Sequence, residues 1–425
     1  MRSLSLLVMV LIFAWSLNVT YAQEDELALI ESVAVLQSQL DSDSEAEQDK
    51  AEQKLIGMGV EILDYLRPTD ENSTSDYRQR LAKIRKSLEK ESVNAVAQAS
   101  KVSINGTFEL EDVFKRIKNQ TGNELAIADG VETEEVSLQL EKAEFWAALN
   151  ELKSAANLEI DRYGSEKPNQ LKLVPKLDGT KKKEAPSCFA KIFQAEVQRV
   201  DSSVNLDDER LDYTSVNLLI RWEPRLTPIS VDIPLADVKI LDEFGESVPV
   251  RTPDRVLYGT VQPEIPEVEF SLQFPRVDRQ VENLKSLAAK IVAVIPGRAE
   301  QFRFENVGKL KVGHKLSKAG ALVTYGGIQK NEELYGVKVS LSFDEENNAL
   351  ESHQGWVFNN EVYLQDRQGN REESLTMETF RQDNEMVTVQ YYFLKEPGDR
   401  TLVYKTPATI IKLPVEIELK KIPLP

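Results

Sequence analysis

Four acidic residues near the start of the chain have the spacing of a calcium-binding loop. They fall at positions 1, 3, 5 and 12 of such a loop: Asp41, Asp43, Glu45 and Glu52. The sixth position, where the loop needs glycine for its sharp turn, holds Ala46. The same residues suit a turn between two helices, because acidic side chains are favoured at a helix N-terminus. We therefore expect a turn here, and neither a metal nor another cofactor.

Residue types that usually carry catalysis are scarce. The two histidines, His314 and His353, lie in polar, turn-like segments, and the single cysteine, Cys188, is expected to be buried and unreactive. The sequence has no G-x-S-x-G elbow, H-E-x-x-H helix, paired C-x-x-C or phosphate-binding loop. Carboxylate pairs of the glycosidase kind stay an open alternative, since such residues lie far apart in sequence. The sequence predicts a protein that is not an enzyme.

Aromatic residues on predicted strands are candidates for binding. An exposed aromatic face can stack on a sugar ring or contact a protein. Adjacent side chains of a strand point to opposite faces, so one of Tyr391 and Tyr392 must face outward. Trp222 ends an apolar run and is expected in the core. We take Tyr391, Tyr392 and Trp356 as the partner-binding candidates.

The acidic balance of the chain argues against nucleic acid as a partner. There are 52 basic and 70 acidic residues, which give a net charge of −18. Such a charge repels phosphate backbones unless a local basic patch compensates. The longest basic run, residues 181–183, lies in a linker-like stretch and is expected to be a solvated spacer.

The first 22 residues have the pattern of a secretory signal peptide. Met1-Arg2 is a short basic region, residues 4–17 are mostly apolar, and Thr20-Tyr21-Ala22 is a small-x-small cleavage site. An uncleaved anchor is the alternative. No later segment approaches about 18 consecutive apolar residues, so we expect no membrane span after cleavage. The pattern predicts an exported protein of the periplasm or cell envelope, or an extracellular one.

Residues 23–98 are predicted to form helices. Three apolar stripes with helical period run from Leu27 to Leu36, from Ala51 to Leu66 and from Tyr77 to Leu88. Pro68 is expected to close the second helix. The stretch from Ala51 to Leu66 is similar to a HEAT-like repeat unit. That resemblance implies a helical cap that packs on a neighbour or contacts a partner.

Residues 99–175 contain one pattern twice, a strand followed by an amphipathic helix and another strand. In the first copy Val113, Phe114 and Ile117 share a helix face, and Thr121-Gly122 ends the helix. The segment resembles the short N-terminal domain of secretins and TonB-dependent receptors. The resemblance implies a small βαββαβ docking module. A pore is not expected, because the strand-rich remainder lacks a long barrel-forming region.

The remaining residues are predicted to form two strand-rich domains after a linker at 176–187. Short matches recur at an offset near 120 residues, such as Val268–Phe274 with Val387–Phe393 and Phe302–Phe304 with Ile417–Leu419. We therefore expect tandem antiparallel β-sandwiches at 188–308 and 309–425. Two unrelated strand-rich domains are the alternative.

These parts together predict a multi-domain α+β protein with N-terminal helical hairpins, the βαββαβ module and two tandem antiparallel β-sandwiches. Their order resembles that of exported proteins of planctomycete-type bacteria, a resemblance that implies no particular activity. The expected function is a non-catalytic protein-interaction or scaffold role with other cell-envelope proteins as partners. A secreted carbohydrate-binding or carbohydrate-active protein is the alternative.

Overall fold

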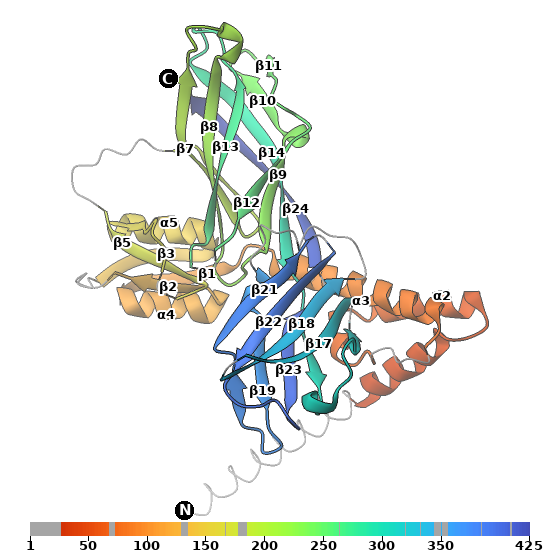
Figure 1. Ribbon diagram of the computed structural model, residues 1–425. Helices are drawn as coiled ribbons and strands as arrows, with labels where there is room; N and C mark the ends of the chain where they lie inside the picture. Colours follow the sequence, from red (N-terminus) through yellow and green to blue (C-terminus); the bar gives the residue numbers. More distant parts are fainter. Residues whose placement is uncertain are drawn as a thin grey trace, which may run out of the picture. The chain divides into compact units, whose positions relative to one another are not determined.

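The computed structural model describes residues 27–425 apart from 68–72, 129–134, 166, 177–184, 263, 319, 332, 344–349, 351–355, 384 and 409. Over these residues the protein is mixed α+β, rich in strands and built from several antiparallel sheets (Figure 1). The predicted signal peptide and most of the predicted linker lie outside the described residues. In the described part of the chain, no helix is both long and apolar enough to cross a membrane.

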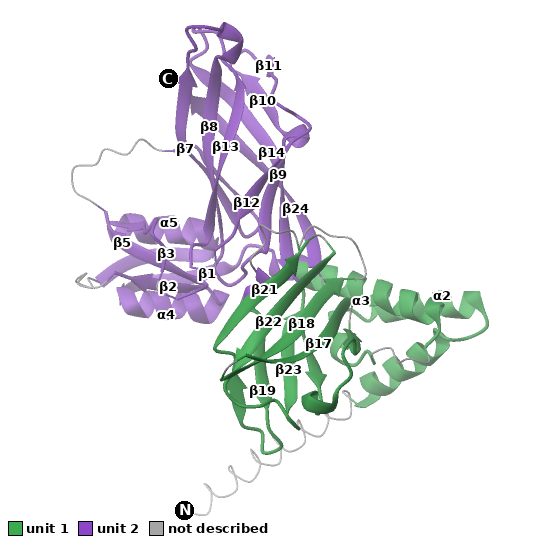
Figure 2. Cartoon of the chain, in the orientation of Figure 1, with its two compact units in different colours: residues 1–93, 297–350, 359–409 green, residues 94–296, 351–358, 410–425 purple. Residues whose placement is uncertain are grey.

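The chain forms two compact units and passes from one to the other more than once (Figure 2). Unit 1 comprises residues 1–93, 297–350 and 359–409, and unit 2 comprises residues 94–296, 351–358 and 410–425. The units are therefore not consecutive stretches of sequence.

Helices make up the first part of unit 1. Residues 27–39 are helical, and α2 (Glu45–Gly57), the 3-10 helix η1 (Val60–Asp64) and α3 (Ser75–Val96) follow. Leu81, Ile84 and Leu88 of α3 are buried in one core with Leu55 of α2. This confirms that the third predicted stripe, from Tyr77 to Leu88, faces a hydrophobic core.

The second stripe differs from the prediction. The stretch from Ala51 to Leu66 is not one helix, because α2 ends at Gly57. Gly59 has φ of 82°, a backbone conformation through which an α-helix cannot continue. The first stripe lies on a helix as predicted: Val33 is buried in the same core and Leu29 and Leu36 pack against it, whereas Leu27 and Val35 are 65% and 51% exposed.

Unit 2 begins with what we call the α/β module, residues 101–175. Its elements are β1 (Lys101–Glu109), α4 (Leu110–Thr121), β2 (Glu124–Ile127), β3 (Glu135–Glu144), α5 (Phe145–Ala155), β4 (Leu158–Ile160) and β5 (Gln170–Pro175). Strands β1 and β3 pair antiparallel, and the other three form a sheet in the order β2-β5-β4. Among the residues that the structure describes, β4 is therefore one edge of that sheet and β2 is the other.

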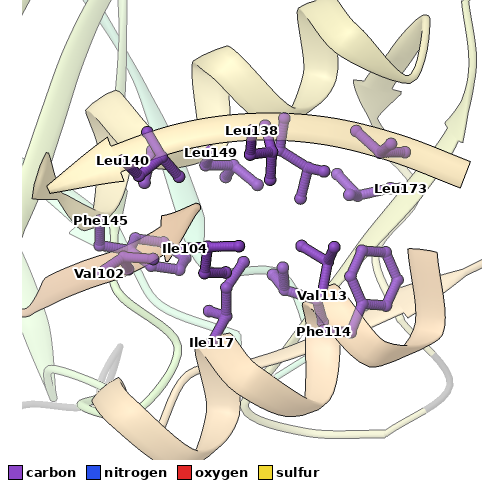
Figure 3. Close-up of a cluster of buried hydrophobic side chains, with 14 of the residues drawn as sticks. Val102, Ile104, Val113, Phe114, Ile117, Leu138, Leu140, Phe145, Leu149 and Leu173 are labelled. Atoms are coloured by element: carbon purple, nitrogen blue, oxygen red, sulfur yellow. The ribbon is translucent and has the colours of Figure 1, made fainter. Parts of the chain in front are cut away.

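The predicted helix face of the α/β module is confirmed. Val113, Phe114 and Ile117 of α4 are buried and point toward Leu138 and Leu140 of β3 (Figure 3). The helix ends because Gly122 adopts a left-handed conformation, with φ of 77°, and its N–H donates to the Lys118 carbonyl.

Unit 2 also contains two sheets that we call the first sheet pair. One sheet has the order β13-β8-β7-β6, and the other contains β11, β10, β14, β9, β12 and β24. Their bounds are β6 (Ser187–Ala190), β7 (Phe193–Ser203), β8 (Tyr213–Trp222), β9 (Ser230–Pro234), β10 (Lys239–Asp242), β11 (Ser247–Val248), β12 (Val256–Thr260), β13 (Glu267–Pro275), β14 (Asn283–Pro296) and β24 (Ile410–Pro423).

Unit 1 contains the second sheet pair, with strand orders β15-β23-β19-β20 and β16-β17-β18-β22-β21. The strands are β15 (Ala299–Phe304), β16 (Lys315–Lys318), β17 (Ala321–Asn331), β18 (Leu334–Phe343), β19 (Glu361–Gln365), β20 (Arg371–Glu373), β21 (Thr376–Gln382), β22 (Met386–Phe393) and β23 (Thr401–Pro407).

The two sheet pairs share a strand order, and their final strands are exchanged relative to the predicted domains. Each sheet of the first pair has a counterpart in the second pair whose strands follow in the same order. The order β13-β8-β7-β6 matches β22-β18-β17-β16, and the order β11-β10-β14-β24 matches β20-β19-β23-β15. Strand β15 pairs with β23, and β24 pairs with β14. The predicted boundary between residues 308 and 309 therefore does not separate the sheets. The exchange is physically allowed because β24 along most of its length and β15 over residues 302–304 alternate buried and exposed residues, so that each can complete the same kind of sheet edge.

Candidate functional site

A pocket of about 560 Å³ lies within unit 2, where the α/β module meets the first sheet pair. The module contributes the end of α5, including Ser154, and the edge strand β4. The first sheet pair contributes Gln194 and Glu196 of β7 and Arg221 of β8. Segments far apart in the sequence therefore form this site jointly.

The edge strand β4 presents backbone groups on the side away from β5. The Asp161 N–H donates to the Lys172 carbonyl, and the Lys176 N–H donates to the Asn157 carbonyl, both at 2.9 Å. In an antiparallel ladder the residues that bond to the partner strand alternate. The N–H and C=O groups of Leu158 and Ile160 consequently point to the open edge of β4, and both residues line the pocket.

The opposite wall holds buried polar side chains. Gln194 lies opposite Arg221 in the β7–β8 ladder. The Arg221 guanidinium is held by Glu267, with Nε–Oε2 of 2.8 Å, and by Glu196, with Nη1–Oε2 of 3.2 Å. Gln194 is 2% exposed, and its Oε1 accepts no hydrogen bond from any described residue. Because an unsatisfied buried acceptor costs about 1–3 kcal/mol, a donor from a ligand would be stabilising there.

A second pocket of about 510 Å³ adjoins the first and shares Arg162, Ala185 and Glu196 with it. It follows β7 past Gln198, whose Nε2 is buried and makes no hydrogen bond to a described residue, and reaches Pro425. We call the two adjoining pockets the β4–β7 groove. The groove is elongated along β7.

A buried carboxylate fixes the two walls of the groove to each other. Glu223 follows β8 and is 0% exposed. It accepts hydrogen bonds from the Ser100 N–H (2.9 Å) and hydroxyl (2.7 Å), from Asn123 Nδ2 (3.0 Å) and from Arg225 Nε (2.7 Å). Ser100 and Asn123 flank β1 and α4, so this cluster joins the α/β module to the first sheet pair. A further link is the Trp146 indole, whose Nε1 donates to the Ile192 carbonyl at 2.8 Å.

Of the four acidic residues with calcium-loop spacing, Asp41 and Glu52 have separate partners. Glu52 is 7% exposed and pairs with Arg80 (3.3 Å) and Lys83 (2.5 Å), both on α3. Asp41 accepts a hydrogen bond from Thr74. No cluster of three or more metal-ligating side chains occurs among the residues that the structure describes. Residues 40–43 form the expected turn before α2, and Glu52 joins α2 to α3 through its ion pairs.

The aromatic candidates differ in exposure. Tyr391 is 2% exposed and packs beside Tyr404, with ring centroids 6.3 Å apart, so it offers no surface to a partner. Tyr392 lies half-buried on the other face, and its hydroxyl donates to Glu378 at 2.8 Å. Trp356 begins the 3-10 helix η6 (Trp356–Asn359) and is half-buried. Trp222 is fully buried, which confirms its predicted place in the core.

Cys188 and His314 do not line the groove. His314 is exposed, and His353 lies outside the described residues. Cys188 on β6 is half-buried, and burial raises the pKa of its thiol. A raised pKa leaves less of the reactive thiolate near neutral pH.

Sequence reasoning missed the β4–β7 groove and the Glu223 cluster. The one available signal was Glu223 itself, a charged residue directly after the apolar run that ends in Trp222. Nothing in the spacing connects it with Ser100 and Asn123, which lie about a hundred positions earlier.

No protein-family model, curated protein or solved structure significantly matches the chain.

Proposed function

We propose that the protein is a non-catalytic binding protein of the periplasm or cell envelope that holds another envelope protein in the β4–β7 groove. The observation that carries this proposal is the groove itself, with the buried Gln194 oxygen in its wall that no described residue hydrogen-bonds. Concave sites with a few placed polar groups are the usual form of binding sites. The signal-like residues 1–22 support an exported location.

The charges that line the first pocket favour a partner without high net charge. The lining contains four basic and three acidic side chains, namely Lys153, Arg162, Lys176, Arg221, Glu159, Asp161 and Glu196. Such a near-neutral wall lacks the one-sign field that draws nucleic acids or polyanions. A neutral or mixed-charge protein surface suits it better.

The rest of the chain fits a scaffold role in this proposal. We interpret the two sheet pairs as tandem β-sandwiches, the helices of unit 1 as a HEAT-like cap and the α/β module as a secretin-like docking module. Each would add surface for partners, with Tyr392 and Trp356 as candidate contacts outside the groove.

The test blocks the groove with a bulky side chain. Ser154 is exposed on α5 and lines the groove, so Ser154→Trp would fill part of it. Ala147 is exposed on the same helix, two turns earlier, and does not line the groove, so Ala147→Trp is the matched control. We expect the wild-type chain and the control to retain the same proteins from a native envelope extract, and Ser154→Trp to lose them. Equal retention by all three would refute a role for the groove.

A carbohydrate ligand is the second candidate function. Tyr163 is 94% exposed and lines the groove beside Asp161 and Arg162, a combination of aromatic and polar groups that suits a sugar ring. Retention on polysaccharide columns that Tyr163→Ala abolishes would favour this function over protein binding. Retention that Tyr163→Ala leaves unchanged would count against it.

A further inference from the structure

We propose that the ligand of the β4–β7 groove is an extended polypeptide segment, which adds to β4 as a new edge strand of the β2-β5-β4 sheet. This inference rests on the proposed binding function and names the partner's conformation and chemistry. A sheet edge recognises an extended chain through its backbone, whatever the side chains are.

The open edge of β4 has the hydrogen-bonding groups that strand addition needs. Leu158 and Ile160 each direct an N–H and a C=O away from β5. Residues two apart on a strand repeat every 6.6–6.8 Å or so, which matches the repeat of the bonded pairs on an added antiparallel strand. The two N–H and two C=O groups of Leu158 and Ile160 therefore have the spacing needed to hydrogen-bond one extended segment.

The groove also supplies partners for the side chains of the added strand. In the two adjoining pockets, Gln194 contributes an amide oxygen and Gln198 an amide nitrogen that form no hydrogen bond with any described residue. Arg221 is already paired with two carboxylates, so it does not demand an acidic ligand. The favoured segment is therefore uncharged and polar, with Ser, Thr, Asn or Gln side chains that can donate to and accept from these amides.

Strand addition explains the shape of the groove better than a sugar does. The site continues along β7 through shared residues into the second pocket, as an elongated ligand requires. A saccharide would use the exposed Tyr163 ring and would leave the β4 backbone groups unpaired.

The test selects peptides and then removes one backbone donor. Random 12-residue peptides displayed on phage would be selected on the full chain and counter-selected on Ser154→Trp. The best peptide would then be synthesised and its affinity measured for Ile160→Pro. Proline removes the outward N–H of Ile160 without breaking a bond to β5, and proline is tolerated at such edge positions. We expect at least a tenfold loss of affinity, with Ile160→Val as the control that keeps the N–H.

Hydrogen exchange gives a second readout that does not depend on a variant. A bound peptide should slow exchange of the Leu158 and Ile160 amides, while the Glu159 amide, which faces β5, should change little. Gln194→Met, which keeps the side-chain length but removes the amide, should weaken binding several-fold and leave Tm unchanged or higher. These measurements keep the inference testable if Ile160→Pro fails to fold.

The outcomes separate this inference from the proposed function. Loss of binding in Ser154→Trp with full binding in Ile160→Pro, and no protection of Leu158 and Ile160, would overturn strand addition but keep the groove as a binding site. Failure to select any peptide that discriminates Ser154→Trp would overturn the inference. Binding of a purified polysaccharide that displaces the peptide and depends on Tyr163 would also overturn it.

Discussion

Replacement of Glu223 should separate the α/β module from the first sheet pair. The carboxylate is 0% exposed and accepts four hydrogen bonds, one of them from the Arg225 guanidinium. Glu223→Leu would remove the acceptor of all four bonds, and loss of one partner from a buried ion pair costs about 3–5 kcal/mol. In a unit of roughly 200 residues, about 2–4 °C of Tm is lost per kcal/mol, so we expect a fall of about 6–20 °C.

The assay is calorimetric unfolding together with hydrogen exchange. Glu269 is exposed on β13 of the same sheet, so Glu269→Leu is the matched control and should change stability by no more than about 0.5 kcal/mol. Amides of α4 and β1 should exchange faster in Glu223→Leu, because Ser100 and Asn123 lose their partner. A loss below about 1 kcal/mol would refute the reasoning, since the carboxylate would then contribute no more than an ordinary hydrogen bond.

Three further predictions concern other parts of the chain. Ile417 is buried on β24, so Ile417→Ala should destabilise unit 2 by about 2–5 kcal/mol, whereas the control Glu416→Ala, at an exposed position, should cost at most about 0.5 kcal/mol. If β24 belongs to the sheet of β14, the β14 amides of Ile417→Ala should exchange their hydrogens faster. Faster hydrogen exchange in the second sheet pair alone would contradict this pairing. Burial raises the pKa of Tyr404 to about 12 from 10.0, so the neutral phenol is favoured in the folded state. The stability that this group adds should be intact below pH 10 and should decrease as pH rises toward 12, and Tyr404→Phe should flatten that decrease in alkaline titrations followed by circular dichroism. Burial also raises the pKa of Cys188, so a thiol reagent at pH 7 should modify the folded chain more slowly than the urea-unfolded chain, and equal rates would contradict this.

Local features of the fold were predictable because a short stretch of sequence determines them. Ile117 and Val113 repeat with the helical period, and Gly122 ends α4 where the turn needs a left-handed residue. The alternation in β24 and β15 likewise predicted two strands correctly. Their sheets could not be predicted, because both strands have the same alternation and sequence does not say which edge each one joins.

The candidate site was hidden for a related reason. Its polar residues have ordinary local explanations: Gln194, Glu196 and Arg221 lie on strands where outward polar residues are expected. They form a pocket only because the α/β module packs against that face of the sheet. This packing depends on contacts between residues more than a hundred positions apart in sequence, such as Ser100 and Glu223. Backbone edges such as that of β4 have no residue signature at all, since every residue but proline carries the same N–H and C=O groups.

The strand exchange also affects the proposed binding groove. Strand β24 comes from residues 410–423, yet it completes the sheet of β14 in unit 2, and the Glu418 backbone hydrogen-bonds the Cys188 thiol on β6. Pro423 to Pro425 then line the second pocket of the groove, anchored by the Leu424 N–H to the Glu282 carbonyl at 2.8 Å. One end of the groove is thus built from residues that follow the whole second sheet pair in sequence. A change that displaces β24 should therefore weaken ligand binding as well as stability, even though no residue of β4 or β8 is altered.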